Sequence, residues 1–478
     1  MAHYKYERLS AQDNDFLRWE SENLSMHGGG IIVFDAGSLA TAEGGIDFAT
    51  IKRGLEGVLH KIPRYRQRLA WIPGTDRAVW IDDATFNIDY HIRHTALPRP
   101  GSEAQLKQLG ARIAERRLDR LRPLWEMWVV EGLEGGRFAL IWKTHHCVVD
   151  GMGGLDLLPT LLSASPDYTL SEPHRFIPRP APSEDELLRD DRARRAALPL
   201  RALGGVANLL RDPGGSAEEL GEGLRELVKM ARFKAVPASD TPLNGPVGPH
   251  RVLDWLSTPL SDVKEIRKAL ECSVNDVVLA IVTGAVREFL IQRQVRPEML
   301  EFRVATPVNV RREGDEGSLG NRVSSWIVPL PIGLEDPIER VAAIHATTRE
   351  LKESHQAAAV EMVEALHEWI PFDIQALSTG TQNAYVTNLP GPQMPLYFFG
   401  AEMREAYLFS PLLENLGLAV GVLSYNGRLC WGLTADYDRI PDVSALAQHL
   451  ESSFEELADA AGLRVSSAPG TRSSSRRE

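Results

Sequence analysis

The sequence predicts a mixed α/β fold, with mixed sheets, made of two halves joined by a long crossover. The chain has 478 residues, which at about 150 residues per domain suggests two to four domains. Strand and helix patterns fill the first and last thirds, whereas Pro, Arg, Asp and Glu dominate from about Ser163 to Pro249. We therefore expect an N-terminal half at residues 1–163, a helical crossover at 164–249, a C-terminal half at 250–464 and a disordered tail at 465–478.

Hydrophobic spacing places the elements of the first half. We predict, in order, a buried strand at Gly30–Asp35, a helix at Ile46–His60, a helix after Ser102 that ends before Pro123, and a hairpin of Trp125–Gly132 and Phe138–Thr144. Ser102 and Gln105 make a capping box, and the apolar helix face that follows runs through Leu118. The hairpin strands are rich in aromatic and β-branched residues, and a Glu-Gly-Gly sequence supplies the turn.

The last third resumes the alternation of strands and helices. We predict a helix at Ser273–Leu290, strands at Phe302–Val308 and Val323–Leu330, a helix at Pro337–His355, a hairpin of Gly417–Ser424 and Arg428–Ala435, and a final amphipathic helix whose apolar residues run from Val443 to Leu457. Asn426 and Gly427 tolerate positive φ and so favour a tight hairpin turn. In the crossover, Ala193–Arg211 and Glu218–Phe233 keep helical apolar spacing, although Pro199 interrupts the first.

Composition excludes several classes of function. The 53 basic and 65 acidic residues leave a formal charge of -12, so a nucleic-acid-binding surface is not expected. No apolar stretch of about 18 residues is present and the opening MAHYKYERLS lacks an apolar signal core, so we expect a cytoplasmic protein without a spanning helix. Three scattered cysteines suit neither a disulfide framework nor a CxxC metal site. The motifs GxSxG, the P-loop and a GxGxxG after a strand are also absent from the sequence.

The main chemical signal is the sequence KTHHCVVDG at the end of the first hairpin. Adjacent side chains on a strand point to opposite faces, so only one histidine can share a face with Thr144, and by parity that one is His146 rather than His145. A neutral histidine can accept a proton from a hydroxyl and return it to a leaving group. Asp150 could fix the following loop, and Gly151 permits a sharp turn. From the residues alone, the alternative that both histidines only cap a strand stays open.

Two other kinds of chemistry are less well supported at this motif. Adjacent strand residues grip one metal ion poorly, and the sequence has no HExxH or CxxC to complete a zinc site, so we expect no metal. Cys147 lies beside His146, but neighbours on a strand point apart. We therefore interpret the thiol as a packing group rather than a nucleophile.

The motif HHCVVDG resembles the HHxxxDG signature of the CoA-dependent acyltransferase superfamily. Further stretches resemble, more specifically, the bacterial wax ester synthase/diacylglycerol acyltransferase family. They are RLSAQDNDFLRWESENLSMHGGG near the start, Pro123-Leu124-Trp125, TPLNGPVGPHR at 241–251, Asn275-Asp276 within SVNDVVLA, SLGNRVS at 318–324 and VTNLPGP at 386–392. The likeness covers nearly the whole chain apart from the tail and parts of the crossover.

The resemblance implies two chloramphenicol-acetyltransferase-like halves, with acyl-CoA and an alcohol entering a tunnel at their seam from opposite sides. It implies an acyl-CoA-dependent O-acyltransferase that esterifies diacylglycerol, long-chain alcohols or both, with His146 as general base and Asp150 in a structural role. Acyl-CoA is then a co-substrate, and no cofactor is expected. The alternatives are a condensation-type enzyme that uses carrier-bound acyl groups and an inactive, lipid-binding relative.

The resemblance also implies roles for two further groups of residues. Asn275 and Asp276 map onto a family motif linked with activity, which makes Asn275 a candidate donor to the oxyanion. Pro123, Leu124 and Trp125 become candidates for the substrate pocket. Helix capping by Asn275 and Asp276, and packing of Trp125 in the core, are the alternatives.

Oily substrates imply contact with a membrane or droplet surface. The crossover gathers arginines among leucines. They are Arg192, Arg194, Arg195, Leu198, Leu200, Arg201, Leu203, Leu209, Leu210 and Arg211. Such a segment suits an interface with anionic lipid, on the inner face of the plasma membrane or on a lipid droplet. The alternative is a solvated helix covering a domain seam, which Pro199 and the paired glycines favour.

Overall fold

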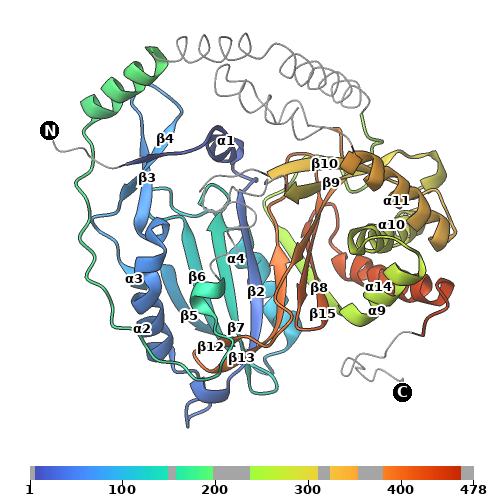
Figure 1. The fold of residues 1–478 in the computed structure, drawn as a ribbon, viewed down its shortest axis with the longest axis horizontal. Helices are drawn as coiled ribbons and strands as arrows, with labels where there is room; N and C mark the ends of the chain where they lie inside the picture. Colours follow the sequence, from blue (N-terminus) through green and yellow to red (C-terminus); the bar gives the residue numbers. More distant parts are fainter. Residues whose placement is uncertain (1–5, 149–157, 197–236, 310–322, 354–379, 465–478) are drawn as a thin grey trace.

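The computed structural model describes residues 6–148, 158–196, 237–309, 323–353 and 380–464. Two six-stranded mixed sheets lie next to each other, with helices over their outer sides, and a three-stranded sheet lies near α1 (Figure 1). The mixed α/β class is therefore confirmed. The predicted helix at Glu218–Phe233 and the C-terminal tail lie outside the described residues, and of the crossover's first predicted helix only the beginning is described, within a helix at 184–196.

The first half contains the sheet ordered β12-β13-β2-β7-β6-β5 and the small sheet ordered β1-β4-β3. The strands are β1 (Glu7–Arg8), β2 (His27–Asp35), β3 (Gln67–Trp71), β4 (Ala78–Asp82), β5 (Ile92–Ala96), β6 (Trp125–Leu133), β7 (Arg137–His145), β12 (Tyr397–Phe398) and β13 (Ala401–Phe409). The helices are α1 (Ala11–Trp19), α2 (Phe48–Val58), α3 (Ile88–His91), α4 (Glu103–Glu115) and α6 (Leu158–Leu161), with 3-10 turns at Gly37–Leu39, Leu59–Lys61 and Pro63–Arg66.

The second half contains the sheet ordered β10-β9-β11-β14-β15-β8. Its strands are β8 (Arg251–Pro259), β9 (Phe302–Asn309), β10 (Val323–Leu330), β11 (Ala384–Pro390), β14 (Leu418–Tyr425) and β15 (Arg428–Asp436). Its helices are α9 (Leu260–Ala269), α10 (Val274–Gln292), α11 (Pro337–Glu353) and α14 (Val443–Ala460), with a 3-10 turn at Pro297–Met299. Helix α10 is apolar on nearly all sides and is buried in the core of this half, in contact with α11 and α14.

One predicted helix is shorter than expected. The predicted capping box is present, but α4 ends at Glu115, so Leu118 packs in a separate apolar cluster. The buried ammonium of Lys143 donates hydrogen bonds to the carbonyl oxygens of Ile113, at 3.0 Å, and Arg116, at 2.8 Å. Carbonyls at the end of α4 therefore find their donor on β7, which satisfies the helix terminus at this point.

One segment of the predicted C-terminal half lies in the first sheet. Sequence spacing assigns residues 250–464 to the second half, but β12 and β13 lie in the first sheet. Strand β13 pairs antiparallel with β2, from Met403 opposite Phe34 to Phe409 opposite Gly29. Alternating apolar residues indicate that a segment is a strand with a buried face, but they do not indicate which strand it pairs with. The chain therefore enters the first sheet again before it returns to the second sheet at β14.

The two sheets meet where β13 crosses the hairpin of β14 and β15. Gly421 and Gly432 lie opposite each other in that hairpin, and both face Leu408 of β13. A Cβ atom on Gly432 would lie 2.0 Å from the carbonyl oxygen of Leu408, so only glycine lets the two backbones approach this closely. Apolar side chains of α4, β2, β8 and β13 fill an adjacent part of the seam.

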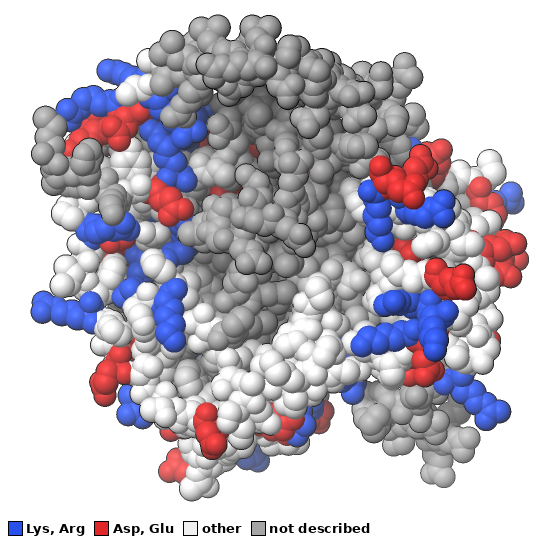
Figure 2. Space-filling model, viewed as in Figure 1, with Lys and Arg blue, Asp and Glu red and all other residues white. Residues whose placement is uncertain are grey.

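The described surface carries charges of both signs. On the face in Figure 2, basic and acidic side chains are interspersed along both flanks, without one sign prevailing over the described part. No single described helix has the length and apolar composition needed to span a membrane. Helices α9 and α10 meet that test only as a pair with a bend of 100° between them, and α10 is a core helix of the second half.

Candidate active site

His146 directly follows β7 and lies between β2 and α1. Its backbone N–H donates to the carbonyl oxygen of Met26 at 2.9 Å. Its ring lies over Gly28, where a Cβ atom would be 3.3 Å from Nε2, and against the ring of Phe16, with the centroids 5.2 Å apart. Gly28 pairs with Thr144 across the sheet, so the ring of His146 lies on the face of the sheet that carries Thr144. This is the face that strand parity predicts.

The surroundings of His146 belong to both halves of the molecule. Phe16 and Met26 pack in one apolar cluster with Tyr385 of β11 and Ala419 of β14. These two strands lie in the second sheet, whereas His146 follows a strand of the first. His146 therefore lies at the seam, where the sequence predicts the active site.

His146 has the protonation state that a general base requires. Burial and, to a lesser extent, the neighbouring His27 lower the pKa of its imidazole to about 4. The ring is therefore neutral near pH 7, while the residue as a whole is only partly buried. A neutral imidazole that remains accessible can take a proton from a hydroxyl group.

His145 lies on the opposite face and is fully buried. Its backbone N–H donates to the carbonyl oxygen of Leu124 at 3.0 Å, and its Nδ1 accepts the N–H of Cys147 at 3.1 Å. Because Nδ1 accepts, the hydrogen of the neutral ring is on Nε2, which faces Oε1 of Glu20 at 3.8 Å. Burial holds the pKa of His145 well below its usual value. The side chain is therefore a neutral structural group, closed off from substrate.

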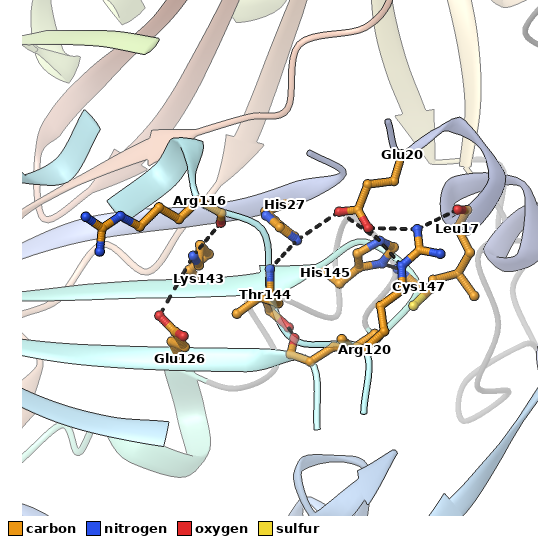
Figure 3. A network of polar contacts seen from close by, with 12 residues as sticks. Leu17, Glu20, His27, Arg116, Arg120, Glu126, Lys143, Thr144, His145 and Cys147 are labelled. Atoms are coloured by element: carbon orange, nitrogen blue, oxygen red, sulfur yellow. Dashed lines mark hydrogen bonds and ion pairs between the residues drawn. The ribbon is translucent and has the colours of Figure 1, made fainter. Parts of the chain in front are cut away.

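A buried polar cluster surrounds His145 (Figure 3). Oε2 of Glu20 accepts from Nε and Nη2 of Arg120, at 2.9 and 2.7 Å, and its Oε1 lies 3.1 Å from Nε2 of His27. Burial alone would raise the pKa of Glu20, but the close contact with His27 and the guanidinium of Arg120 lower it to about 2. Burial lowers the pKa of His27. The cluster therefore holds an ionised carboxylate against a guanidinium and two neutral imidazoles.

The ligand atoms of Glu20, His27 and His145 lie within 4.8 Å of one another, which is a spacing that a metal ion could use. A histidine that binds a metal normally donates its other ring N–H to a neighbour. His145 does the reverse, because its Nδ1 accepts a backbone N–H and its Nε2 therefore carries the hydrogen. The donor set consequently fits a hydrogen-bonded cluster rather than a metal site. Burial also raises the pKa of the Cys147 thiol well above its usual value, which agrees with a packing role.

The Asn275-Asp276 pair lies at the start of α10. Asp276 is fully buried and completes a capping box with Ser273, whose backbone N–H donates to Oδ2 at 2.8 Å. Nδ1 of His345 lies 2.9 Å from Oδ2, and the hydroxyl of Thr348 donates to Oδ1 at 2.7 Å. Both carboxylate oxygens are thus engaged in joining α10 to α11, which supports the capping interpretation for Asp276. Asn275 is partly buried beside it.

Replacing Asp276 by Asn is expected to destabilise the protein by about 1–3 kcal/mol at pH 7, because a charged acceptor of buried hydrogen bonds is lost. Burial alone would raise the pKa of Asp276, but its hydrogen bonds, that of His345 foremost, hold it below the usual 3.8. A lowered pKa contributes stability above the unfolded-state value, and that contribution disappears as the pH falls through the folded-state value. The difference in the free energy of unfolding between variant and wild type should therefore become smaller below about pH 4.

Urea unfolding at pH 7, 5 and 3 measures this effect. The exposed Asp240 provides the control, since its change to Asn should alter the free energy of unfolding by less than about 0.5 kcal/mol at each pH. A difference between the Asp276 variant and wild type that stays constant over this pH range would contradict the assigned role.

The Pro-Leu-Trp sequence is part of the core of the first half. Trp125 is 2% exposed, donates through Nε1 to the carbonyl oxygen of Tyr65 at 2.9 Å, and stacks on Tyr65 and His91 with ring centroids 4.6 Å apart in each pair. The carbonyl oxygen of Leu124 accepts the backbone N–H of His145. These contacts agree with the packing interpretation of Trp125, and they also fix the end of β7.

Some predicted site residues lie outside the described structure, and some residues of the site carry no sequence motif. Asp150 and Gly151 lie outside the described residues, so their predicted roles stay predictions. Conversely, Phe16, Glu20 and Arg120 were not singled out by the sequence analysis, although they surround the two histidines. Phe16 and Glu20 do belong to the opening stretch on which the resemblance partly rests.

Comparison with known proteins identifies the family. Residues 9–278 match the wax ester synthase/diacylglycerol acyltransferase catalytic domain, and residues 319–458 match the C-terminal domain of the same family. The chain belongs to this family. The match to the wax ester synthase/diacylglycerol acyltransferase catalytic domain includes His146, Glu20 and the crossover, so the family similarity extends over both halves.

Relatives and solved structures agree with this assignment. Two Mycobacterium tuberculosis relatives that carry the name diacylglycerol O-acyltransferase are each 32% identical to this chain: Rv1760 covers 94% of this chain and 90% of its own length, and tgs1 covers 94% and 95%. The wax ester synthase/diacylglycerol acyltransferase of Marinobacter aquaeolei VT8 matches with a TM-score of 0.68 and 23% identity, over 95% of this chain and 100% of that one. The first condensation domain of the CDA synthetase matches with a TM-score of 0.57 and 14% identity, over 96% and 97%. These structural matches confirm the predicted fold of two related halves.

Proposed function

We propose that this chain is an acyl-CoA-dependent O-acyltransferase that esterifies diacylglycerol, long-chain alcohols or both, with His146 as its general base. The observation that carries the proposal is the neutral, partly accessible imidazole of His146, held over Gly28 at the seam of the two halves. Membership of the family and the names of the two mycobacterial relatives support the class of reaction and its lipid substrates.

The chemistry requires one proton to move twice. The imidazole of His146 takes the proton of the acceptor hydroxyl while the oxygen forms a bond to the thioester carbonyl carbon. When the tetrahedral intermediate collapses, the carbon–sulfur bond breaks and the imidazolium returns the proton to the thiolate of CoA. Asn275, at the start of α10, stays our candidate for an oxyanion donor, a contribution worth about 2.7–4 kcal/mol in other enzymes.

A panel of acceptors tests the proposal directly. The purified protein is incubated with palmitoyl-CoA and, separately, with a diacylglycerol, hexadecanol or a long-chain amine, and both CoA release and product are measured. We expect ester formation with at least one alcohol. The absence of ester with every alcohol would overturn the proposed function. The same panel ranks diacylglycerol against fatty alcohol, a preference that depends on many packed side chains.

A condensation-type reaction is the second candidate, because the fold also matches a peptide-synthetase condensation domain. Such an enzyme would form an amide from a carrier-bound acyl group. Amide formation in the panel, without ester, would favour it. An inactive lipid-binding protein would release no CoA with any acceptor while still retaining the acyl chain.

We further propose that the protein works from the cytoplasm at a membrane or droplet surface, because its proposed substrates are lipids. The segment suggested for this contact, the arginine- and leucine-rich part of the crossover, lies mostly outside the described residues. Liposome flotation with anionic vesicles tests the contact. If the arginines of this segment are changed to glutamine, flotation should decrease, and undiminished flotation would argue against the segment.

A further inference from the structure

Helix α1 and the residue after it contact both histidines of the motif, one on each face of the sheet. Phe16, within α1, packs against the ring of His146, with ring centroids 5.2 Å apart. Glu20, which directly follows α1, faces Nε2 of His145 at 3.8 Å and Nε2 of His27 at 3.1 Å. The same short segment therefore touches the proposed base and is tied to the histidine that precedes it.

Glu20 is held on its other side by Arg120. The guanidinium donates twice to Oε2 of Glu20, and its Nη2 also donates to the carbonyl oxygen of Leu17 in α1, at 2.6 Å. Figure 3 shows these groups converging from α1, β7 and the segment before β6. The side chain of Glu20 is 2% exposed. A buried carboxylate that accepts from a guanidinium and faces two imidazoles has little freedom to move.

Backbone hydrogen bonds connect the residues around Glu20 to His146. His27 lies directly opposite His145 in the register of β2 and β7, and the N–H of His146 donates to Met26, the residue before His27. The N–H of Val148 then donates to the carbonyl oxygen of His145 at 2.9 Å, which closes a tight turn just after β7. The place and direction of this turn decide where the ring of His146 points.

We propose that Glu20 is a positioning residue for His146. Through Arg120 it holds the end of α1, and its carboxylate lies against the rings of His27 and His145; it thereby keeps the ring of His146 over Gly28 and against Phe16. This inference rests on the proposed function of His146 as the base. Glu20 itself takes no proton in the reaction, because its carboxylate contacts the buried face of the sheet.

Glutamine at position 20 is the sharpest test of this role. A carboxylate accepts at both oxygens, whereas an amide accepts at one. Glu20→Gln must therefore turn its NH₂ group either toward the guanidinium of Arg120 or toward the Nε2–H of His145. We expect kcat to fall by about 10- to 100-fold, the range that a misplacement of about 1 Å carries. The KM for palmitoyl-CoA should change by less than about twofold, because the side chain of Glu20 is buried and offers no surface to CoA.

Two further variants separate positioning from mere charge balance. Glu126→Gln is the matched control, since Glu126 is a buried carboxylate on β6 that lies 3.2 Å from Arg93 and 3.8 Å from Lys143 rather than beside His145. It should keep kcat within about threefold of wild type. The double variant Glu20→Gln/Arg120→Gln has no unbalanced guanidinium. If Glu20 only neutralised Arg120, this double variant would regain wild-type kcat, and that result would overturn the proposal.

A spectroscopic measurement tests the same role without turnover. In the full-length protein labelled with ¹⁵N-histidine, long-range ¹H–¹⁵N spectra report the ring nitrogens of each histidine, and His146→Ala assigns the signals of His146. We expect the Nε2–H tautomer of His145 in wild type, Glu126→Gln and Glu20→Gln alike, because the N–H of Cys147 fixes it, but shifted or broadened ring signals of His146 in Glu20→Gln alone. Unchanged His146 signals in Glu20→Gln would overturn the positioning role. An inactive wild type with the expected spectra would instead overturn only the proposed function.

If Glu20→Gln fails to fold, Glu20→Asp provides a second variant. It keeps the negative charge but withdraws it from His145, so it should lower kcat at unchanged KM.

Discussion

Replacing His146 by alanine is expected to lower kcat for acyl transfer by about 10²- to 10⁴-fold, the usual contribution of a general base. The fold should survive, because His146 is only partly buried and its structural contacts are chiefly the backbone bond to Met26 and the contact with Phe16. Binding of acyl-CoA should change little, since the lost group acts on the acceptor hydroxyl in the transition state.

Initial rates with palmitoyl-CoA and the preferred alcohol measure this effect, together with thermal unfolding as a check on folding. His94→Ala is the matched control, because His94 lies on β5 of the same sheet, is partly exposed and is paired with Glu131 away from the seam. It should keep its activity. If His146→Ala kept more than about one tenth of the wild-type kcat, His146 could not be the base.

The pH dependence follows from the same environment. His146 must be neutral to accept a proton, and its pKa is lowered to about 4. Activity should therefore be independent of this group between about pH 5 and 7 and decline only as the pH approaches 4. A pH–rate profile of kcat/KM, recorded where the protein remains folded, would place this acidic limb.

Replacing Gly432 by valine is expected to have the largest effect on stability, at least about 3 kcal/mol, because it overpacks a contact between two backbones. The Cβ atom of the new side chain alone would lie 2.0 Å from the carbonyl oxygen of Leu408. That oxygen belongs to the main chain and cannot rotate away. Valine also adds two methyl groups. Since single domains are stable by only about 5–15 kcal/mol, much of the margin would be lost, and the two sheets would separate at β13.

Urea unfolding of purified protein measures the change, with intrinsic fluorescence as the signal. Thr434→Val provides a control two residues further along β15. It adds no bulk and removes only the hydroxyl that accepts the N–H of Ser410 at 3.2 Å, so it should cost about 1 kcal/mol. A Gly432→Val protein as stable as this control would show that β13 can shift without penalty.

Local features of the fold were predictable from local sequence. The hairpin of β14 and β15 turns at Asn426 and Gly427 with φ of 42° and 78°, as the dipeptide indicates. Strand β10 begins and ends where predicted, and α10 starts with a capping box at Ser273. These features depend on residues that are close in sequence, so their pattern contains the information needed to place them.

Features that depend on distant partners were not predictable in this way. The spacing of β13 indicates an amphipathic strand, but its pairing with β2 depends on residues more than 300 positions away. The end of α4 depends on Lys143 of β7, which no pattern inside the helix reveals. Predicting that α4 ends at Glu115 would have required knowledge of that buried ammonium.

The candidate site shows the same division. The motif and strand parity were sufficient to single out His146 and to separate it from His145. They did not indicate the groups around these histidines, because Glu20 and Arg120 are 100 residues apart and each resembles an ordinary surface charge in its own segment. Only the tertiary fold shows that Glu20 is buried beside the histidines and paired there with Arg120.

The return of β13 to the first sheet has a consequence for synthesis on the ribosome. Strand β2 is made early, but its neighbour on one side is not translated until residue 409. Until then β2 is an open sheet edge with unpaired N–H and C=O groups, the kind of edge that pairs with other chains. We therefore expect the nascent first half to be prone to aggregation until translation is nearly complete, and to rely on chaperones for most of its synthesis.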